Sequence, residues 1–193
     1  MFRIFRAQCK DCVCAFIEFR KAFFSSSGTS TYLTKNRYYG KFSASIIPLD
    51  EADTVIPLDG YNYIGYLTFP TLGMELPVMD TWDAQRLRRA PCRYYGSAET
   101  HDLVIAAHNY RSSFGQCRNL QIGDEICFTD AAGIVHKYLI GEIEIVEPTA
   151  VEYMISSDWD LSLYTCTYSG AQRLTVRCTE QRDAAAPLSD HVM

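Results

Sequence analysis

A cysteine and an arginine in the second half of the sequence are spaced so that they could act together on a carbonyl group. Cys166 ends one alternating apolar stretch, Arg173 begins the next, and the turn-forming pair Ser169-Gly170 lies between them. A cation beside a thiol favours the nucleophilic thiolate, and a guanidinium can donate hydrogen bonds to an oxyanion. The alternative interpretation is a buried cysteine in a hairpin beside a solvated arginine.

A histidine that could serve this cysteine follows another apolar stretch. Residues 103–107 are strongly apolar, His108 comes directly after them, and polar residues follow. Histidine is the usual acid or base for a cysteine nucleophile, and the two can be far apart in sequence. His101 and His136 are alternative bases, and a lone histidine at a strand end is more often structural. The amide of Asn109 could orient a ring, but a continuing strand would point it elsewhere.

A second arginine competes for the role of Arg173. Arg177 lies on the same face of the predicted strand at residues 173–179. It is displaced from Arg173 by about 13 Å along the strand, because each residue adds 3.3 Å. We therefore assign the role to Arg173.

The order of these residues resembles the sortases, the cysteine transpeptidases of Gram-positive cell surfaces. That family has a histidine after an apolar strand, a Thr-Cys pair that ends a strand, and an arginine that opens the next. The matching residues here are His108, Thr165-Cys166 and Arg173. Many sortases have glycine where this chain has Ala107, a small change that leaves the three residues in place.

Two further segments resemble the same family. Residues 63–77 are similar to its opening hairpin, and residues 119–130 are similar to the segment after the histidine loop. The resemblance extends over about residues 60–179. It implies an all-β fold, an eight-stranded β-barrel with short connecting helices.

The resemblance also implies a reaction, acyl transfer from a peptide with a sorting signal similar to Leu-Pro-x-Thr-Gly. Cys166 is then the nucleophile, His108 the general acid and base, and Arg173 the donor to the oxyanion or substrate carbonyl. Thr165 is implied to bind substrate. The acceptor would be an amine of a cell-wall precursor or of a protein lysine. A peptidase that hydrolyses the peptide and a catalytically silent peptide-binding barrel are the alternatives.

Many short strands with few helices favour an antiparallel barrel or sandwich without any appeal to resemblance. We expect strands at 63–69, 74–79, 103–107, 125–129, 134–146, 161–166 and 173–179, and helical segments at 80–89, 111–119 and 148–154. The predicted domain organisation is an N-terminal extension at 1–59, partly disordered or helical, a catalytic barrel at 60–180, and a mobile tail at 181–193.

Composition narrows the classes of partner. The 193 residues are 48% hydrophobic with a net charge of −5, and no basic run suits a phosphate backbone, so we expect no nucleic acid. Of the eight cysteines, Cys9, Cys12 and Cys14 have no fourth metal ligand nearby in sequence, and we expect neither a metal nor a cofactor.

The first residues contain no apolar run long enough for a transmembrane anchor or a signal peptide. Sortases usually carry such an anchor, and the family resemblance implies a place on the cell surface, at the outer face of the cytoplasmic membrane. The sequence also contains no Asp-Pro-aromatic tripeptide, the lid motif that pilus-type sortases often place before the barrel.

Overall fold

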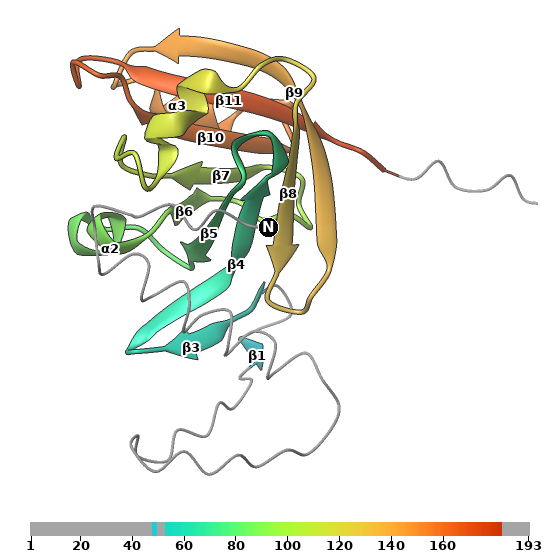
Figure 1. Ribbon diagram of the computed structural model, residues 1–193. Helices are drawn as coiled ribbons and strands as arrows, with labels where there is room; N and C mark the ends of the chain where they lie inside the picture. Colours follow the sequence, from blue (N-terminus) through green and yellow to red (C-terminus); the bar gives the residue numbers. More distant parts are fainter. Residues whose placement is uncertain (1–47, 50–52, 183–193) are drawn as a thin grey trace, which may run out of the picture.

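A computed structural model describes residues 48–49 and 53–182 (Figure 1). The cysteines near the N-terminus, most of the predicted N-terminal extension and the predicted tail from residue 183 on lie outside the described residues. Two short strands, β1 (Pro48–Leu49) and β2 (Asp53–Thr54), pair with each other in a small separate sheet.

The main sheet closes on itself into the predicted barrel. Its strand order is β4-β5-β6-β7-β10-β11-β9-β8, β8 pairs back to β4, and β3 (Ile56–Leu58) adds to the outer end of β4. This confirms the predicted eight-stranded β-barrel. The bounds of these strands are β4 (Tyr61–Phe69), β5 (Met74–Met79), β6 (Cys92–Tyr95), β7 (Leu103–Ala106), β8 (Glu125–Asp130), β9 (Val135–Val146), β10 (Leu161–Cys166) and β11 (Arg173–Glu180).

Most neighbouring strands are antiparallel, but β5 pairs with β6 in parallel, and so does β7 with β10. The carboxyl ends of β7 and β10 therefore lie at the same edge of the barrel, whereas the antiparallel β11 begins there. Figure 1 shows these three strands side by side in the order β7, β10, β11.

Barrel closure depends on close approach of β8 to β4 at Gly65. A Cβ atom at this position would lie 2.1 Å from the carbonyl oxygen of Thr129, and φ of Gly65 is 149°. Only glycine has neither the steric conflict nor the conformational penalty.

Alternation along β10 and β11 divides their side chains between two environments. Leu161, Leu163, Val176 and Cys178 point into the apolar interior of the barrel. Residues on the opposite face, among them Tyr164, contact a second cluster outside the barrel that includes Val104, Val146 and Met154. Cys166 lies on this outer face, because it is two residues beyond Tyr164.

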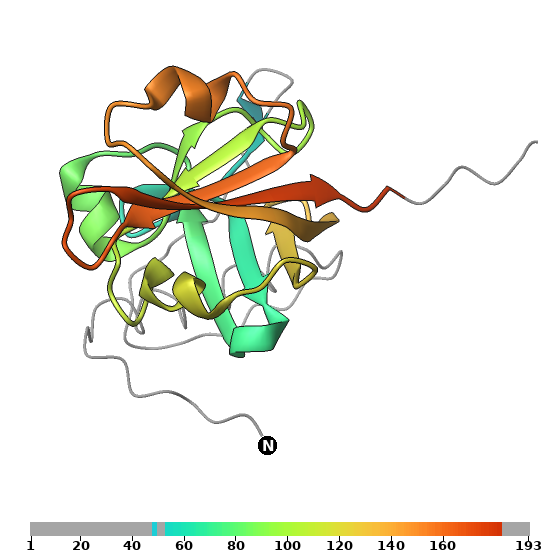
Figure 2. The ribbon, with the colours of Figure 1, turned by 90° about the horizontal axis from the view of Figure 1, so that it is seen from above.

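Short helices fill the connections, as predicted. α2 (Ala84–Arg89) begins later than the predicted residue 80, because the Asp83 side chain caps it by accepting from the backbone N–H groups of Gln85 and Arg86. The bounds of the others are η2 (Pro70–Leu72), η3 (Phe114–Asn119) and α3 (Val151–Ile155). Figure 2 shows α3 (orange) and η3 (yellow) on opposite sides of the strands.

The short strands β1 and β2, and two strands of the main sheet, β3 and β6, were not predicted from the sequence. β6 is short and follows Pro91 directly, so its four residues show no clear period. β3 precedes the predicted start of the barrel at residue 60 and pairs with β4 through Ile56 and Tyr63. No helix in the described part of the chain is long and apolar enough to cross a bilayer.

Candidate active site

Strand register places the predicted cysteine and arginine directly opposite each other. In the antiparallel pair of β10 and β11, Cys166 is the partner of Arg173. The intervening turn is closed by the Thr167 N–H, which donates to the Gln172 carbonyl at 2.9 Å, and by Gly170 with φ 76°. The hairpin therefore places Cys166 and Arg173 on neighbouring strand ends, as the sequence predicted.

The parallel pairing of β7 and β10 places His108 beside this hairpin. Ala106, the last residue of β7, is the register partner of Tyr164. Two residues further along each segment come His108, just past the end of β7, and Cys166, and both line the same outer groove. His108, Cys166 and Arg173 all line one groove, with a volume of about 280 Å³. Residues 65 positions apart in sequence thus share one site.

Aromatic side chains form one side of the groove. The ring centroids of Trp82 and Tyr94 are 5.4 Å apart, and those of Tyr94 and Tyr164 are 5.5 Å apart in an edge-to-face arrangement. Burial raises the pKa of Tyr164 above its usual value. The remaining apolar lining includes Leu87, Pro148, Val151 and Met154.

Sequence reasoning missed most of this lining. Tyr164 could have been found, because it alternates with Cys166 and so shares its face. Tyr94 could not, because it lies in the unpredicted strand β6. Trp82 precedes α2 and gives no signal of its position by spacing alone.

His108 lies in a half-buried position with its ring stacked on Tyr110. The two ring centroids are 4.8 Å apart and the ring planes are inclined by 29°. The His108 carbonyl accepts a hydrogen bond from the Phe114 N–H at 3.2 Å. Burial, and to a lesser degree the positive charge of Arg88, lowers the pKa of His108 below its ordinary value of 6.5.

Arg173 lies at the rim of the groove and has donors to spare. Its Nη1 donates to the carbonyl oxygens of Gly170 and Gln172, both at 3.2 Å. Within the described residues Arg173 forms no ion pair with a carboxylate. Since a guanidinium carries five N–H donors, Nε and Nη2 remain able to bind a group in the groove.

The alternative arginine, Arg177, is fully buried and occupied. Its Nε donates to Glu144 at 2.9 Å, and its Nη1 donates to Ser162 at 2.8 Å. The guanidinium also stacks over the ring of Tyr153 and donates to the carbonyl of that residue. Arg177 therefore links α3 to the barrel and is not available to a ligand.

Thr165 belongs to the groove lining but is only 3% exposed as a residue. Its hydroxyl donates to the Ala107 carbonyl at 2.8 Å. The hydroxyl therefore has a partner inside the protein, and substrate binding by Thr165 remains a prediction.

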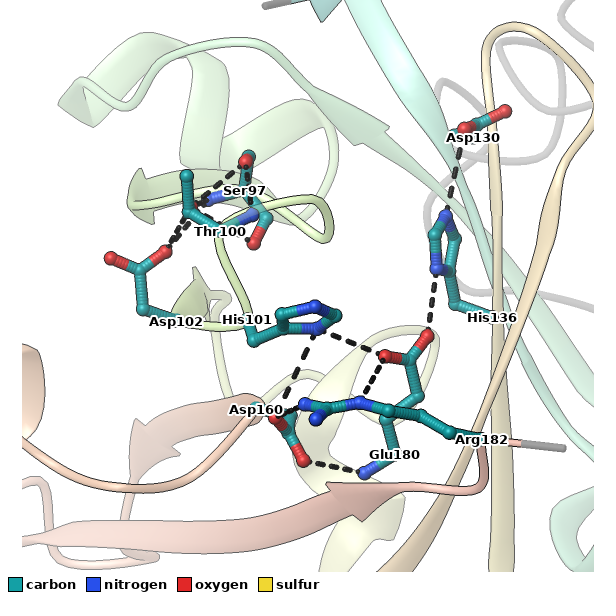
Figure 3. Close-up of polar contacts among 9 residues, drawn as sticks. All are labelled: Ser97, Thr100, His101, Asp102, Asp130, His136, Asp160, Glu180 and Arg182. Carbon is teal, nitrogen blue, oxygen red and sulfur yellow. Dashed lines mark hydrogen bonds and ion pairs between the residues drawn. The ribbon is translucent and has the colours of Figure 1, made fainter. Parts of the chain in front are cut away.

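The two alternative histidines lie at the other end of the barrel (Figure 3). His101 Nδ1 is 3.0 Å from Glu180 Oε2, and His136 Nδ1 is 2.9 Å from Glu180 Oε1. Arg182 pairs with Asp160 at 2.7 Å beside them. This set of side chains, here called the distal network, holds the start of β10 to the end of β11, because the Glu180 N–H also donates to Asp160.

The other described cysteines are unsuited to nucleophilic chemistry. Burial raises the pKa of Cys92 and of Cys117 to about 12, and it also raises the pKa of Cys178. The pKa of Cys127 is raised by burial and by Glu125. All five described cysteines are free thiols, and no group of described side chains is arranged to hold a metal ion.

The fold and groove define a class of protein, a closed β-barrel with a cysteine, a histidine and an arginine on one outer rim. The family model described as a sortase domain matches residues 67–181. The chain belongs to the sortase family. A search of curated proteins found no match.

Solved structures of sortases share the fold. Sortase C1 from Streptococcus agalactiae superposes with a TM-score of 0.57 at 22% identity, covering 66% of this chain and 72% of that one. Sortase C from Streptococcus pneumoniae has a TM-score of 0.55 at 25% identity, with coverage of 64% and 71%. Sortase C1 from Streptococcus suis has a TM-score of 0.54 at 24% identity, with coverage of 64% and 75%.

Proposed function

We propose that this chain is a cysteine transpeptidase that cleaves a sorting peptide similar to Leu-Pro-x-Thr-Gly and transfers it to an amine. The observation that carries the proposal is the shared groove of His108, Cys166 and Arg173 on adjacent strands. Membership of the sortase family supports the same reaction class. The apolar and aromatic lining suits an extended peptide with aliphatic side chains.

The first half of the reaction forms an acyl-enzyme. The Cys166 thiolate attacks the carbonyl carbon of the substrate threonine, and the carbonyl oxygen becomes an oxyanion that accepts hydrogen bonds from Arg173. As the C–N bond breaks, protonated His108 gives its proton to the departing amine. A thioester between Cys166 and the peptide remains.

The second half reverses the roles. An acceptor amine attacks the thioester carbonyl, and neutral His108 takes a proton from it. The C–S bond breaks, Cys166 leaves as thiolate, and a new amide bond is complete. The lowered pKa of His108 favours the neutral form that this step requires.

Hydrolysis is the competing outcome, because water could resolve the same thioester. Incubation of the protein with quenched sorting peptides, with and without an amine acceptor, separates these functions by mass spectrometry. We expect an amine adduct to replace the free acid when the acceptor is present. Free acid as the sole product under both conditions would make the protein a peptidase, and no cleavage of any peptide would support a silent barrel.

The proposed partners follow from this reaction. They are a surface protein that carries the sorting signal and an amine on a cell-wall precursor or on a second protein. Sortases generally act at the cell surface, and we propose the outer face of the cytoplasmic membrane for this chain. Fractionation of cells that produce the protein, followed by protease treatment of intact protoplasts, tests that location.

A further inference from the structure

Two side-chain hydrogen bonds bracket the catalytic histidine and cysteine. The Thr165 hydroxyl donates to the Ala107 carbonyl at 2.8 Å. Thr165 directly precedes Cys166, and Ala107 directly precedes His108. One residue after the histidine and the cysteine, the Asn109 amide donates to the Thr167 carbonyl at 3.0 Å. Both bonds cross from the end of β7 to the end of β10.

These bonds occur where the backbone ladder between β7 and β10 stops. The last backbone bond across it joins the Ala107 N–H to the Tyr164 carbonyl at 3.2 Å. Beyond this point each chain turns to its own loop: the His108 carbonyl accepts from Phe114, and the Thr167 N–H donates to Gln172. Around the reacting pair, side chains therefore replace the missing backbone ladder.

The histidine loop is also held from its other side. A Cβ atom on Gly115 would lie 2.3 Å from the Asn109 carbonyl oxygen, and the Gly115 N–H donates to the Tyr110 carbonyl at 3.0 Å. The backbone of Asn109 is thus packed against Gly115 while its amide reaches across to Thr167. Asn109 is therefore held at its backbone and at its side chain. His108, which lies between Asn109 and the end of β7, has little freedom to move.

We propose that Asn109 and Thr165 are positioning residues that hold His108 and Cys166 in register for proton transfer. This inference rests on the proposed function. It gives the Asn109 amide the role of joining the histidine loop to the end of β10. It assigns the Thr165 hydroxyl to alignment of the two strands, and not to the substrate. The cost of losing alignment is in turnover, since displacement of a catalytic group by 1 Å can reduce a rate by about 10²-fold.

The kinetic test compares Asn109→Ala and Asn109→Leu with Gln116→Ala. Gln116 lies on η3, in the same connection between β7 and β8 as Asn109, and its amide also donates to a backbone carbonyl, that of Arg111, at 3.0 Å. This bond stays within the loop and does not cross to β10, which makes Gln116→Ala a matched control. We expect both Asn109 variants to lose roughly tenfold or more in kcat with KM within about twofold. The control should stay within twofold of the unmodified protein, and kcat values for Asn109 variants equal to the control would overturn the proposal.

Nuclear magnetic resonance supplies a readout that does not depend on turnover. The four histidines give four ring Cε1–H signals, and His108→Ala assigns the one of interest. Asn109→Ala should move the His108 signal and leave those of His101 and His136 in place, whereas Gln116→Ala should move none of them. If the unmodified protein cleaves no peptide, the proposed function fails while this test still decides whether Asn109 positions the ring. An unmoved His108 signal in Asn109→Ala contradicts the inference even if peptide cleavage is normal.

Thr165 is tested by a pair of variants that separates alignment from substrate binding. Thr165→Val keeps the shape but removes the donor, and Thr165→Ser restores it. We expect Thr165→Val to lower kcat and Thr165→Ser to recover most of it, with KM nearly constant in both. A rise in KM at unchanged kcat would instead return Thr165 to the substrate site and overturn its positioning role.

Discussion

Similar residue types lie at the two ends of β7, β10 and β11, but their partners differ. At one end His108 and Arg173 face a groove, and neither forms an ion pair with a carboxylate among the described residues. At the other end, in the distal network of Figure 3, two histidines and Arg182 are paired with Glu180, Asp160 and Asp130.

The difference separates stability from reactivity. In the distal network His136 and the carboxylates of Glu180 and Asp160 are nearly buried, whereas His101 and Arg182 are exposed. The contacts of this network join β8, β9, β10 and β11 at the edge where the chain leaves the barrel. At the groove, His108 and Arg173 form no ion pair with a described carboxylate, so their donors remain available to the carbonyl or oxyanion of a substrate. Substitutions at the groove should therefore affect rate, and substitutions in the distal network or the core should affect unfolding.

The largest separation is expected between two cysteines of the same hairpin. Cys166→Ala should abolish peptide cleavage and leave the melting temperature nearly unchanged, because the thiol is half-buried at the rim. Cys178→Ala should retain the rate but lose roughly 1–2 kcal/mol of unfolding free energy, because it leaves a cavity in the core. Cleavage of quenched peptides and urea unfolding measure the two effects. Residual cleavage by Cys166→Ala would remove the cysteine from the mechanism.

The histidines give the second contrast. His108→Ala should reduce kcat by roughly 10²- to 10⁴-fold, the usual contribution of a general acid and base. His136→Ala should keep the rate but destabilise the fold by about 1–3 kcal/mol, because Glu180 loses a nearly buried partner. Equal losses of rate in both variants would contradict the division between the two ends.

The arginines give a third, smaller contrast. Arg173→Lys should cost about 2–4 kcal/mol of barrier, because an ammonium lacks the fork of donors that an oxyanion needs. Arg177→Lys should instead lower stability, since its guanidinium holds Glu144, Ser162 and the Tyr153 carbonyl together. Steady-state kinetics and thermal unfolding of both variants measure the outcome. A rate defect confined to Arg177→Lys would reverse the assignment.

The sequence predicted that His108, Cys166 and Arg173 lie together because strand alternation carries direct geometric information. The spacing of Cys166 and Arg173 around a Ser-Gly turn determined their cross-strand pairing, and the apolar run before His108 determined a strand end. Barrel closure itself followed from the family resemblance and is confirmed by the pairing of β4 with β8.

The sequence could not predict contacts that depend on three-dimensional neighbours. Nothing in the spacing of His101, His136 and Glu180 shows that they meet, because they come from different strand ends. The amide of Asn109 was expected to point away along a continuing strand. Instead β7 ends at Ala106, and the turn of the chain after it directs the amide to Thr167.

The smallest expected effect concerns the charge near His108. Burial is the main cause of its lowered pKa, and Arg88 on α2 adds to it, so Arg88→Gln should raise the pKa of His108 toward 6.5 without restoring it fully. Because the folded protein binds fewer protons than the unfolded chain in this range, stability should fall as the pH decreases through 6.5 toward the folded-state pKa. The fall should be smaller in Arg88→Gln. Titration of the His108 ring signal by nuclear magnetic resonance, with Arg118→Gln as an exposed control on η3, measures the shift. An unchanged His108 titration in Arg88→Gln would assign the lowered pKa to burial alone.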